Sequence, residues 1–127
     1  MIQPDRLNIF QAAHGREAVR AILRVIAQTL KNALRPTDLL GRWKGDQFLA
    51  ILNGCREDFL GGVAQRLRAT VSGSGVQWWG DRLSIGVCIA GTGVTQGDTV
   101  DAIVERTESS LKKMLAQSEG GAGSGGV

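Results

Sequence analysis

Cysteine, histidine and long apolar runs are scarce in this sequence. It holds only two cysteines, Cys55 and Cys88, and one histidine, His14. The cysteines form no CxxC or zinc-type spacing, so they indicate two reduced thiols rather than a metal centre. No apolar run approaches the roughly 20 residues that span a bilayer, and no signal peptide is evident. We therefore expect a cytoplasmic domain without a membrane partner.

The excess of one charge is also small. The formal net charge is +3 and the pI is about 9.3, which suits an anionic ligand but is too weak to indicate nucleic-acid binding. Hydrophobic residues make up 43% of the 127 residues, enough for one domain with a real core. No internal repeat is evident.

Apolar periodicity predicts the secondary structure. Steps of three and four residues predict helices at 15–34, 57–71 and 99–117. Residues 7–10 read as a short buried connector before the first of these helices. Apolar runs between turn residues predict strands at 38–43, 47–53, 76–79 and 83–90. This order predicts an α/β fold, an α+β sandwich in which helices flank a largely antiparallel sheet.

The stretch from Arg35 to Phe48 is the best candidate for a functional site. Pro36 should end the preceding helix, because it disfavours helical backbone at the residue before it. Gly45 supplies the permissive backbone of a short hairpin turn. The turn carries a cation, Lys44, and a carboxylate, Asp46, and the two strands would hold both rigidly.

This stretch resembles a known family. Arg42-Trp43-Lys44-Gly45-Asp46-Gln47-Phe48 is similar to the Arg-x-Gly-Gly-Asp/Glu-Glu-Phe signature of GGDEF domains, diguanylate cyclases that join two GTP molecules into cyclic di-GMP. Ser84-Ile85-Gly86-Val87 matches a second motif of that family. The resemblance covers nearly the whole chain, so we expect a GGDEF-like domain at 1–117 and a flexible Gly/Ser-rich tail at 118–127.

The resemblance also implies what has been lost. In the family, two carboxylates bind the Mg²⁺ ions that hold the GTP phosphates. Asp46 retains one of them, whereas an ungapped count places the other on Gln3, with Asp5 two residues later. A carboxamide offers only a neutral oxygen where Mg²⁺ prefers a charged one. Lys44 replaces a signature glycine, and Gln47 replaces the signature glutamate and cannot ionise.

Further family positions are changed as well. The two residues that read guanine fall on Gln11 and Arg20, and a phosphate-binding Ala-Lys pair falls on Met114-Leu115. Together these changes predict a degenerate, inactive domain. Two alternatives stay open: an active diguanylate cyclase that uses Asp46 with Mg²⁺, and a purely structural dimerisation module. At the turn itself, Asp46 and Lys44 could simply pair with each other or face solvent.

A second family site is retained. Many members carry an Arg-x-x-Asp motif five residues before the signature, where cyclic di-GMP binds, and Arg35-Pro36-Thr37-Asp38 matches it. The resemblance adds Arg66 from the next helix. Independently, an arginine offers paired donors to a phosphate or a guanine edge, and a carboxylate accepts from guanine N–H groups. The competing interpretation is that Arg35 and Asp38 pair with each other at a helix end.

The family's central first strand is largely missing here, since only Met1 and Ile2 precede the Gln3 position. Unpaired strand edges invite another chain, so we expect a homodimer or contacts with other domains of a larger signalling protein. The leading hypothesis is a regulatory or interaction module that binds cyclic di-GMP through Arg35, Asp38 and Arg66. Trp43 could stack on a guanine or pack, and one of Trp78 and Trp79 should be exposed.

Overall fold

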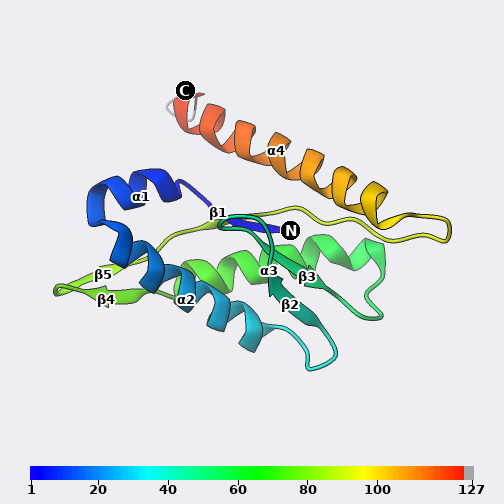
Figure 1. The fold of residues 1–127 in the computed structure, drawn as a ribbon, viewed down its shortest axis with the longest axis horizontal. Helices are drawn as coiled ribbons and strands as arrows, with labels where there is room; N and C mark the ends of the chain where they lie inside the picture. Colours follow the sequence, from blue (N-terminus) through cyan, green and yellow to red (C-terminus); the bar gives the residue numbers. More distant parts are fainter. Residues whose placement is uncertain (125–127) are drawn as a thin grey trace.

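The structure is a computed structural model that describes residues 1–124, with side chains described for residues 1–117. The elements follow in the order β1 (Ile2–Pro4), α1 (Leu7–His14), α2 (Arg16–Ala33), β2 (Leu39–Arg42), β3 (Phe48–Ile51), a 3₁₀ turn η1 (Glu57–Phe59), α3 (Leu60–Gly73), β4 (Val76–Trp78), β5 (Asp81–Leu83), β6 (Val87–Ile89) and α4 (Val100–Ser124). The expected α/β architecture with an antiparallel sheet between helices is confirmed (Figure 1).

The first strand of the main sheet, β1, has only three residues and lies between two other strands. The order of the sheet is β2-β3-β1-β6, and every pairing is antiparallel. Ile2 lies opposite Phe48 on one side and opposite Ile89 on the other. Met1 extends this ladder by exchanging main-chain hydrogen bonds with Ala90 at 2.7 and 3.0 Å. The strand is therefore short but paired on both sides, so the open edges that favoured an assembly do not occur at β1.

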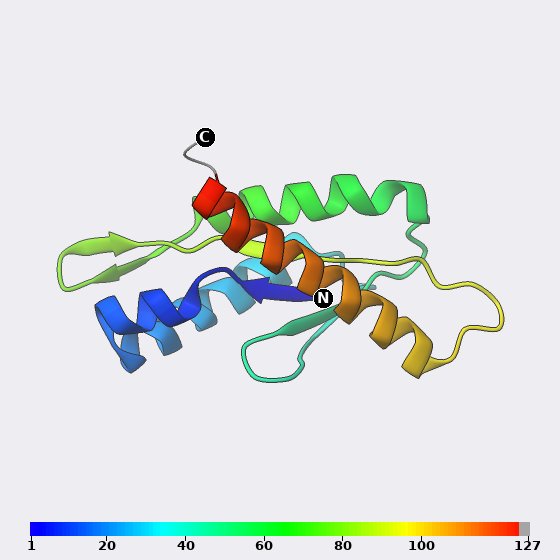
Figure 2. The same ribbon diagram turned by 90° about the horizontal axis from the view of Figure 1, so that it is seen from above.

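Helices cover the two faces of the sheet. Helices α2 and α3 pack on one face, and α4 crosses the other (Figures 1 and 2). The larger core lies under α2, whose buried residues recur at helical spacing: Ala18, Val19, Ile22, Leu23, Ile26 and Leu30. A smaller cluster under α4 contains Met1, Ala90 and Leu111. The alternation of strand residues thus divides them between two cores.

Two predicted elements differ from the structure. Residues 7–10 belong to a helix, α1, rather than to a connector, and positive φ angles at Arg6 (55°) and Gly15 (92°) bound it. The predicted strand at 83–90 is divided, because Leu83 pairs with Val76 in a separate hairpin while 87–89 pair with β1. Local periodicity does not predict this division, because it does not show that one half pairs with β4 and the other half with β1.

The β4–β5 hairpin projects from one end of the molecule in both views (Figures 1 and 2). Trp78 packs against the core, whereas Trp79 at the tip is 91% exposed, as expected for one member of the pair. Trp79 has a φ of 52° and Gly80 a φ of 87°. Two consecutive positive φ angles are typical of the tight turn that joins the two strands of a hairpin through a two-residue loop.

At the other end of the chain, α4 continues to Ser124, whereas the sequence predicted a flexible tail from residue 118. Residues 125–127 of that predicted tail lie outside the described part of the chain. The domain boundary at residue 117 stays a prediction. None of the helices in residues 1–124 is long and apolar enough to cross a membrane.

Candidate functional site

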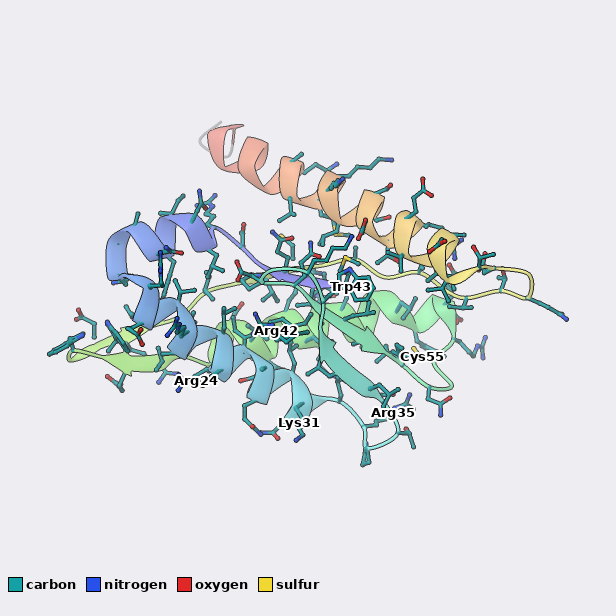
Figure 3. All side chains as sticks on the ribbon, in the orientation of Figure 1. Arg24, Lys31, Arg35, Arg42, Trp43 and Cys55 are labelled. Carbon is teal, nitrogen blue, oxygen red and sulfur yellow. The ribbon has the colours of Figure 1, made fainter. Side chains whose placement is uncertain are left out.

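The signature residues 44–47 and the pair Arg35 and Asp38 lie at opposite ends of the β2–β3 hairpin, whereas Arg66 lies on α3. The turn between the strands carries residues 44–47, and the segment between α2 and β2 carries Arg35 and Asp38 (Figure 3). The antiparallel register, in which Arg42 lies opposite Phe48 and Leu39 opposite Ile51, fixes both ends. The hairpin therefore holds two separate candidate sites.

The signature turn is closed by its own hydrogen bonds. Trp43 donates its main-chain N–H to the Gln47 carbonyl at 2.8 Å, and Gln47 donates to the Lys44 carbonyl at 3.0 Å. Gly45 has a φ of 56°, which a glycine adopts without the steric cost of a Cβ atom. Arg42 donates to the Gly45 carbonyl at 3.1 Å and lies over the Phe48 ring at 5.2 Å. These contacts fix the turn before any ligand arrives.

Two carboxamides join the turn to the first strand. Gln47 donates from Nε2 to Oε1 of Gln3 at 2.8 Å, although the residues lie 44 positions apart. Both side chains are half-buried. The resemblance implies an acidic residue at each of these positions, and in this structure the two positions lie next to each other. Here the Gln3 amide oxygen accepts the hydrogen bond that the Gln47 amide nitrogen donates.

The remaining charges of the turn point elsewhere. Lys44 pairs with Glu108 of α4, with Nζ 3.7 Å from Oε1, and so does not pair with Asp46. Asp46 is exposed in the turn. Within residues 1–117, no three His, Cys, Asp or Glu side chains gather closely enough to hold a metal ion. Asp46 is therefore the one carboxylate that residues 44–47 offer to a cation such as Mg²⁺, which binds through carboxylate, phosphate and water oxygens.

Arg35 and Asp38 form a clamp at the base of the hairpin. Asp38 accepts the main-chain N–H of Arg35 at 2.9 Å and its guanidinium at 3.3 and 3.4 Å. Asp38 also accepts the main-chain N–H of Asn53 at 3.1 Å, and Arg35 donates to the Asn53 carbonyl at 2.6 Å. The two side chains pair with each other, as the competing interpretation of this motif has it, and they also tie the chain after α2 to the chain after β3.

The two side chains of the clamp differ in how much of their surface a ligand could reach. The Asp38 side chain is 3% exposed and the Arg35 side chain 56%. The main-chain N–H of Arg35, followed by its guanidinium and the N–H of Asn53, holds the pKa of Asp38 below its usual range. Asp38 is thus an ionised internal acceptor, whereas part of the Arg35 guanidinium faces solvent. Arg66, exposed on α3, bonds to neither residue.

The structure also assigns roles that the sequence did not indicate. Glu108, the partner of Lys44, sits on a helix far along the chain and carries no local signal. Arg20 pairs with Glu17 at 3.3 Å, and Gln11 is exposed on α1. Trp43 is exposed in part, at the end of β2. Residues 11 and 20 therefore lie on exposed positions of α1 and α2.

A family model described as diguanylate cyclase, GGDEF domain, matches residues 1–120. The chain belongs to the GGDEF family. The family, the fold class and the link to cyclic di-GMP signalling that the resemblance implied are thereby confirmed. The chain is a diguanylate cyclase-like domain of a kind found in bacterial signalling proteins.

Individual relatives agree with the family match. Diguanylate cyclase A of Treponema denticola is 24% identical over 112 residues, which cover 87% of this chain and 30% of the relative. The chain thus spans less than a third of that protein. Among solved structures, the diguanylate cyclase SiaD of Pseudomonas aeruginosa, in complex with its activator SiaC, is 27% identical with a TM-score of 0.78, covering 88% of this chain and 43% of SiaD.

A more distant structure shares the fold. The GGDEF domain of DgcB from Caulobacter crescentus, in complex with c-di-GMP, is 18% identical with a TM-score of 0.77. It covers 94% of this chain and 70% of that domain.

Proposed function

We propose that this GGDEF domain does not synthesise cyclic di-GMP and acts as a regulatory module in a signalling protein. The observation that carries the proposal is the hydrogen bond between Gln3 and Gln47. Catalysis of phosphoryl transfer needs metal ions to neutralise charge on the phosphates. Where the family resemblance implies carboxylates, this domain has two amides bonded to each other.

The surroundings of the turn support the same conclusion. The Lys44–Glu108 pair links the turn to α4, so an incoming triphosphate would meet a cross-link rather than the small glycine of the family signature. Asp46 alone supplies one carboxylate, so a magnesium ion at the turn would depend on phosphate oxygens and waters for its other ligands. GTP could still contact the turn without reacting there.

The regulatory ligand we propose is cyclic di-GMP, bound beside the Arg35 clamp. Arg35 is half-exposed and keeps donors for a guanine edge or phosphate, and Arg66 would supply a second cation. Asp38 would act by positioning Arg35 rather than by contacting the ligand. Its carboxylate oxygens already accept four hydrogen bonds, three from Arg35 and one from Asn53. The relative DgcB was crystallised with this ligand, which supports the choice.

Two measurements test the proposal. The first incubates the domain with GTP and Mg²⁺ and follows cyclic di-GMP formation, beside the variant Gln3→Asp/Gln47→Glu. We expect no product from the unaltered domain; turnover would overturn the assignment as non-catalytic. Product from the variant alone would identify the two amides as the main block.

The second measurement titrates cyclic di-GMP into the domain by calorimetry. Arg35→Ala should weaken binding at least about tenfold, equivalent to about 1.4 kcal/mol, and Arg66→Ala should weaken it as well. Arg16→Ala, a surface change at the far end of α2, is the matched control. An unaltered domain that fails to bind would refute the ligand and leave the non-catalytic assignment untouched.

A further inference from the structure

A basic groove runs along the free edge of the sheet. It lies between α2 and β2, has a volume of about 1100 Å³ and is lined in part by Arg35 and Asp38, the two residues of the clamp described above. Its charged lining consists of Arg24, Lys31, Arg35, Arg42 and Asp38. Four cations against one carboxylate leave an excess of three positive charges, and that carboxylate is already neutralised by Arg35. We refer to this feature as the α2–β2 groove.

The cations are spread along the length of the groove. Arg24 and Lys31 lie two turns apart on α2, about 10 Å along the helix axis. Because the chain reverses between α2 and β2, Lys31 lies towards Arg35 at one end and Arg24 towards Arg42 at the other (Figure 3). A ligand that met all four cations would therefore be extended, with negative charge at both ends.

The wall formed by β2 is an edge strand. The sheet order gives β2 a single neighbour, β3. Trp43 bonds to Gln47 across the hairpin, so the antiparallel alternation directs the N–H groups of Gly41 and Leu39 towards β3 as well. The N–H groups of Leu40 and Arg42 then point into the groove. An edge of this kind is a template for one more strand.

The two faces of β2 differ in character. Arg42 and Leu40 lie on the α2 side, where Arg42 covers the Phe48 ring. On the opposite face, Leu39 is 64% exposed and its cross-strand partner Ile51 is 58% exposed. A strand added at this edge would turn one set of alternate residues towards the cations and the other set towards this apolar pair.

We propose that the α2–β2 groove binds an extended segment of a partner protein in which acidic and apolar residues alternate. The segment adds a strand to β2, with its acidic side chains towards Arg24, Lys31 and Arg42 and its apolar side chains beside Leu39. The backbone supplies affinity, and the cations select against neutral or basic strands. The groove shares Arg35 and Asp38 with the proposed cyclic di-GMP site, but the bound segment is proposed to depend on Arg24, Lys31 and Arg42 and not on Arg66.

The test uses a fluorescent peptide in which glutamate and valine alternate. A peptide of the same composition with its glutamates and valines in separate blocks is the control for pattern. The domain should bind the alternating peptide more tightly than the block peptide. Arg24→Glu/Lys31→Glu should weaken binding of the alternating peptide at least about tenfold. Lys112→Glu/Lys113→Glu makes the same charge change on α4, across the sheet, and should leave binding within about twofold.

A second readout tests the pairing itself. On addition of the alternating peptide, hydrogen exchange should slow at the main-chain N–H groups of Leu40 and Arg42, while that of the inward Gly41 changes little. Absence of binding, equal binding of the block peptide, or binding without this protection would each overturn the proposal. Loss of cyclic di-GMP binding in Arg24→Glu/Lys31→Glu with no peptide affinity would identify the groove as part of a nucleotide site instead.

Discussion

The contact between Gln3 and Gln47 permits a quantitative test of how strongly the two side chains are coupled. The perturbation is the double substitution Gln3→Glu/Gln47→Glu, which keeps the size of both side chains and makes both ionisable. The amide hydrogen bond at 2.8 Å would be lost, at a cost of about 1 kcal/mol. Two negative charges would then face each other in its place.

Repulsion between the two new carboxylates accounts for the larger part of the expected loss of unfolding free energy. Two charges about 4 Å apart interact by about 1 kcal/mol in water and by about 4 kcal/mol near a protein surface. Both side chains are half-buried, so we take an intermediate value of about 2 kcal/mol. Together with the lost hydrogen bond, the double variant should lose about 3 kcal/mol of unfolding free energy at neutral pH.

The single variants are the controls. Gln3→Glu keeps an acceptor for the Gln47 amide, and Gln47→Glu faces a Gln3 amide that can rotate to donate. Each single change should therefore alter the unfolding free energy by less than about 0.5 kcal/mol. The double-mutant cycle then isolates a coupling energy of about 2 kcal/mol or more.

Urea unfolding, followed by tryptophan fluorescence, measures all four proteins. Mg²⁺ should restore part of the stability of the double variant alone, because only that variant presents two facing carboxylates to a cation. Lowering the pH should restore it too, since repulsion raises the pKa of one carboxyl and protonation removes the repulsion. Additive single effects, with no response to Mg²⁺, would show that the two side chains are not neighbours.

Three further predictions concern stability. Trp79→Asn should raise the unfolding free energy by about 1 kcal/mol, because asparagine tolerates the φ of 52° at the hairpin tip better than tryptophan does; a lower urea midpoint would contradict this. Gly75→Ala should destabilise the β4–β5 hairpin, because a Cβ atom would lie 2.7 Å from the Leu83 carbonyl oxygen; an unchanged melting temperature would contradict it. The Arg106 guanidinium and then the Thr95 N–H lower the pKa of Asp98 from 3.8 to about 2. This carboxylate therefore stabilises the fold above pH 3.8, and the contribution is lost as the pH falls through about 2. The stability deficit of Asp98→Asn at neutral pH should shrink as the pH falls from 3.8 through about 2, and a deficit at pH 2 as large as that at neutral pH would refute the assignment.

Much of the fold could be predicted because its signals are local. The spacing of Val19, Ile22, Leu23 and Ile26 predicts α2, since residues three and four apart share one face of a helix. The Gly45 turn between two apolar runs predicts the β2–β3 hairpin. Helix α1 was missed because its few residues follow Pro4 and show little periodicity, and the break before β6 was missed because it depends on which strand pairs with which.

The candidate site divides in the same way. The Arg35–Asp38 motif is local, so its residues and their mutual contact could be anticipated. That Asp38 is also bonded to Asn53 depends on the hairpin register, which places Asn53 beside it. The partner of Lys44 could not be foreseen, because Glu108 reaches the turn only through the packing of α4 on the sheet.

By itself, the sequence determined the family, the main helix and the hairpin, and it placed glutamines at positions 3 and 47. These properties depend on residue identity and on spacing within a single element. Only the tertiary structure decided that the three residues of β1 pair with a strand on each side, that Gln3 contacts Gln47, and that a basic groove lies beside β2. Those features arise where elements far apart in the chain pack together, and side-chain contacts across that distance are set by register and packing rather than by local pattern.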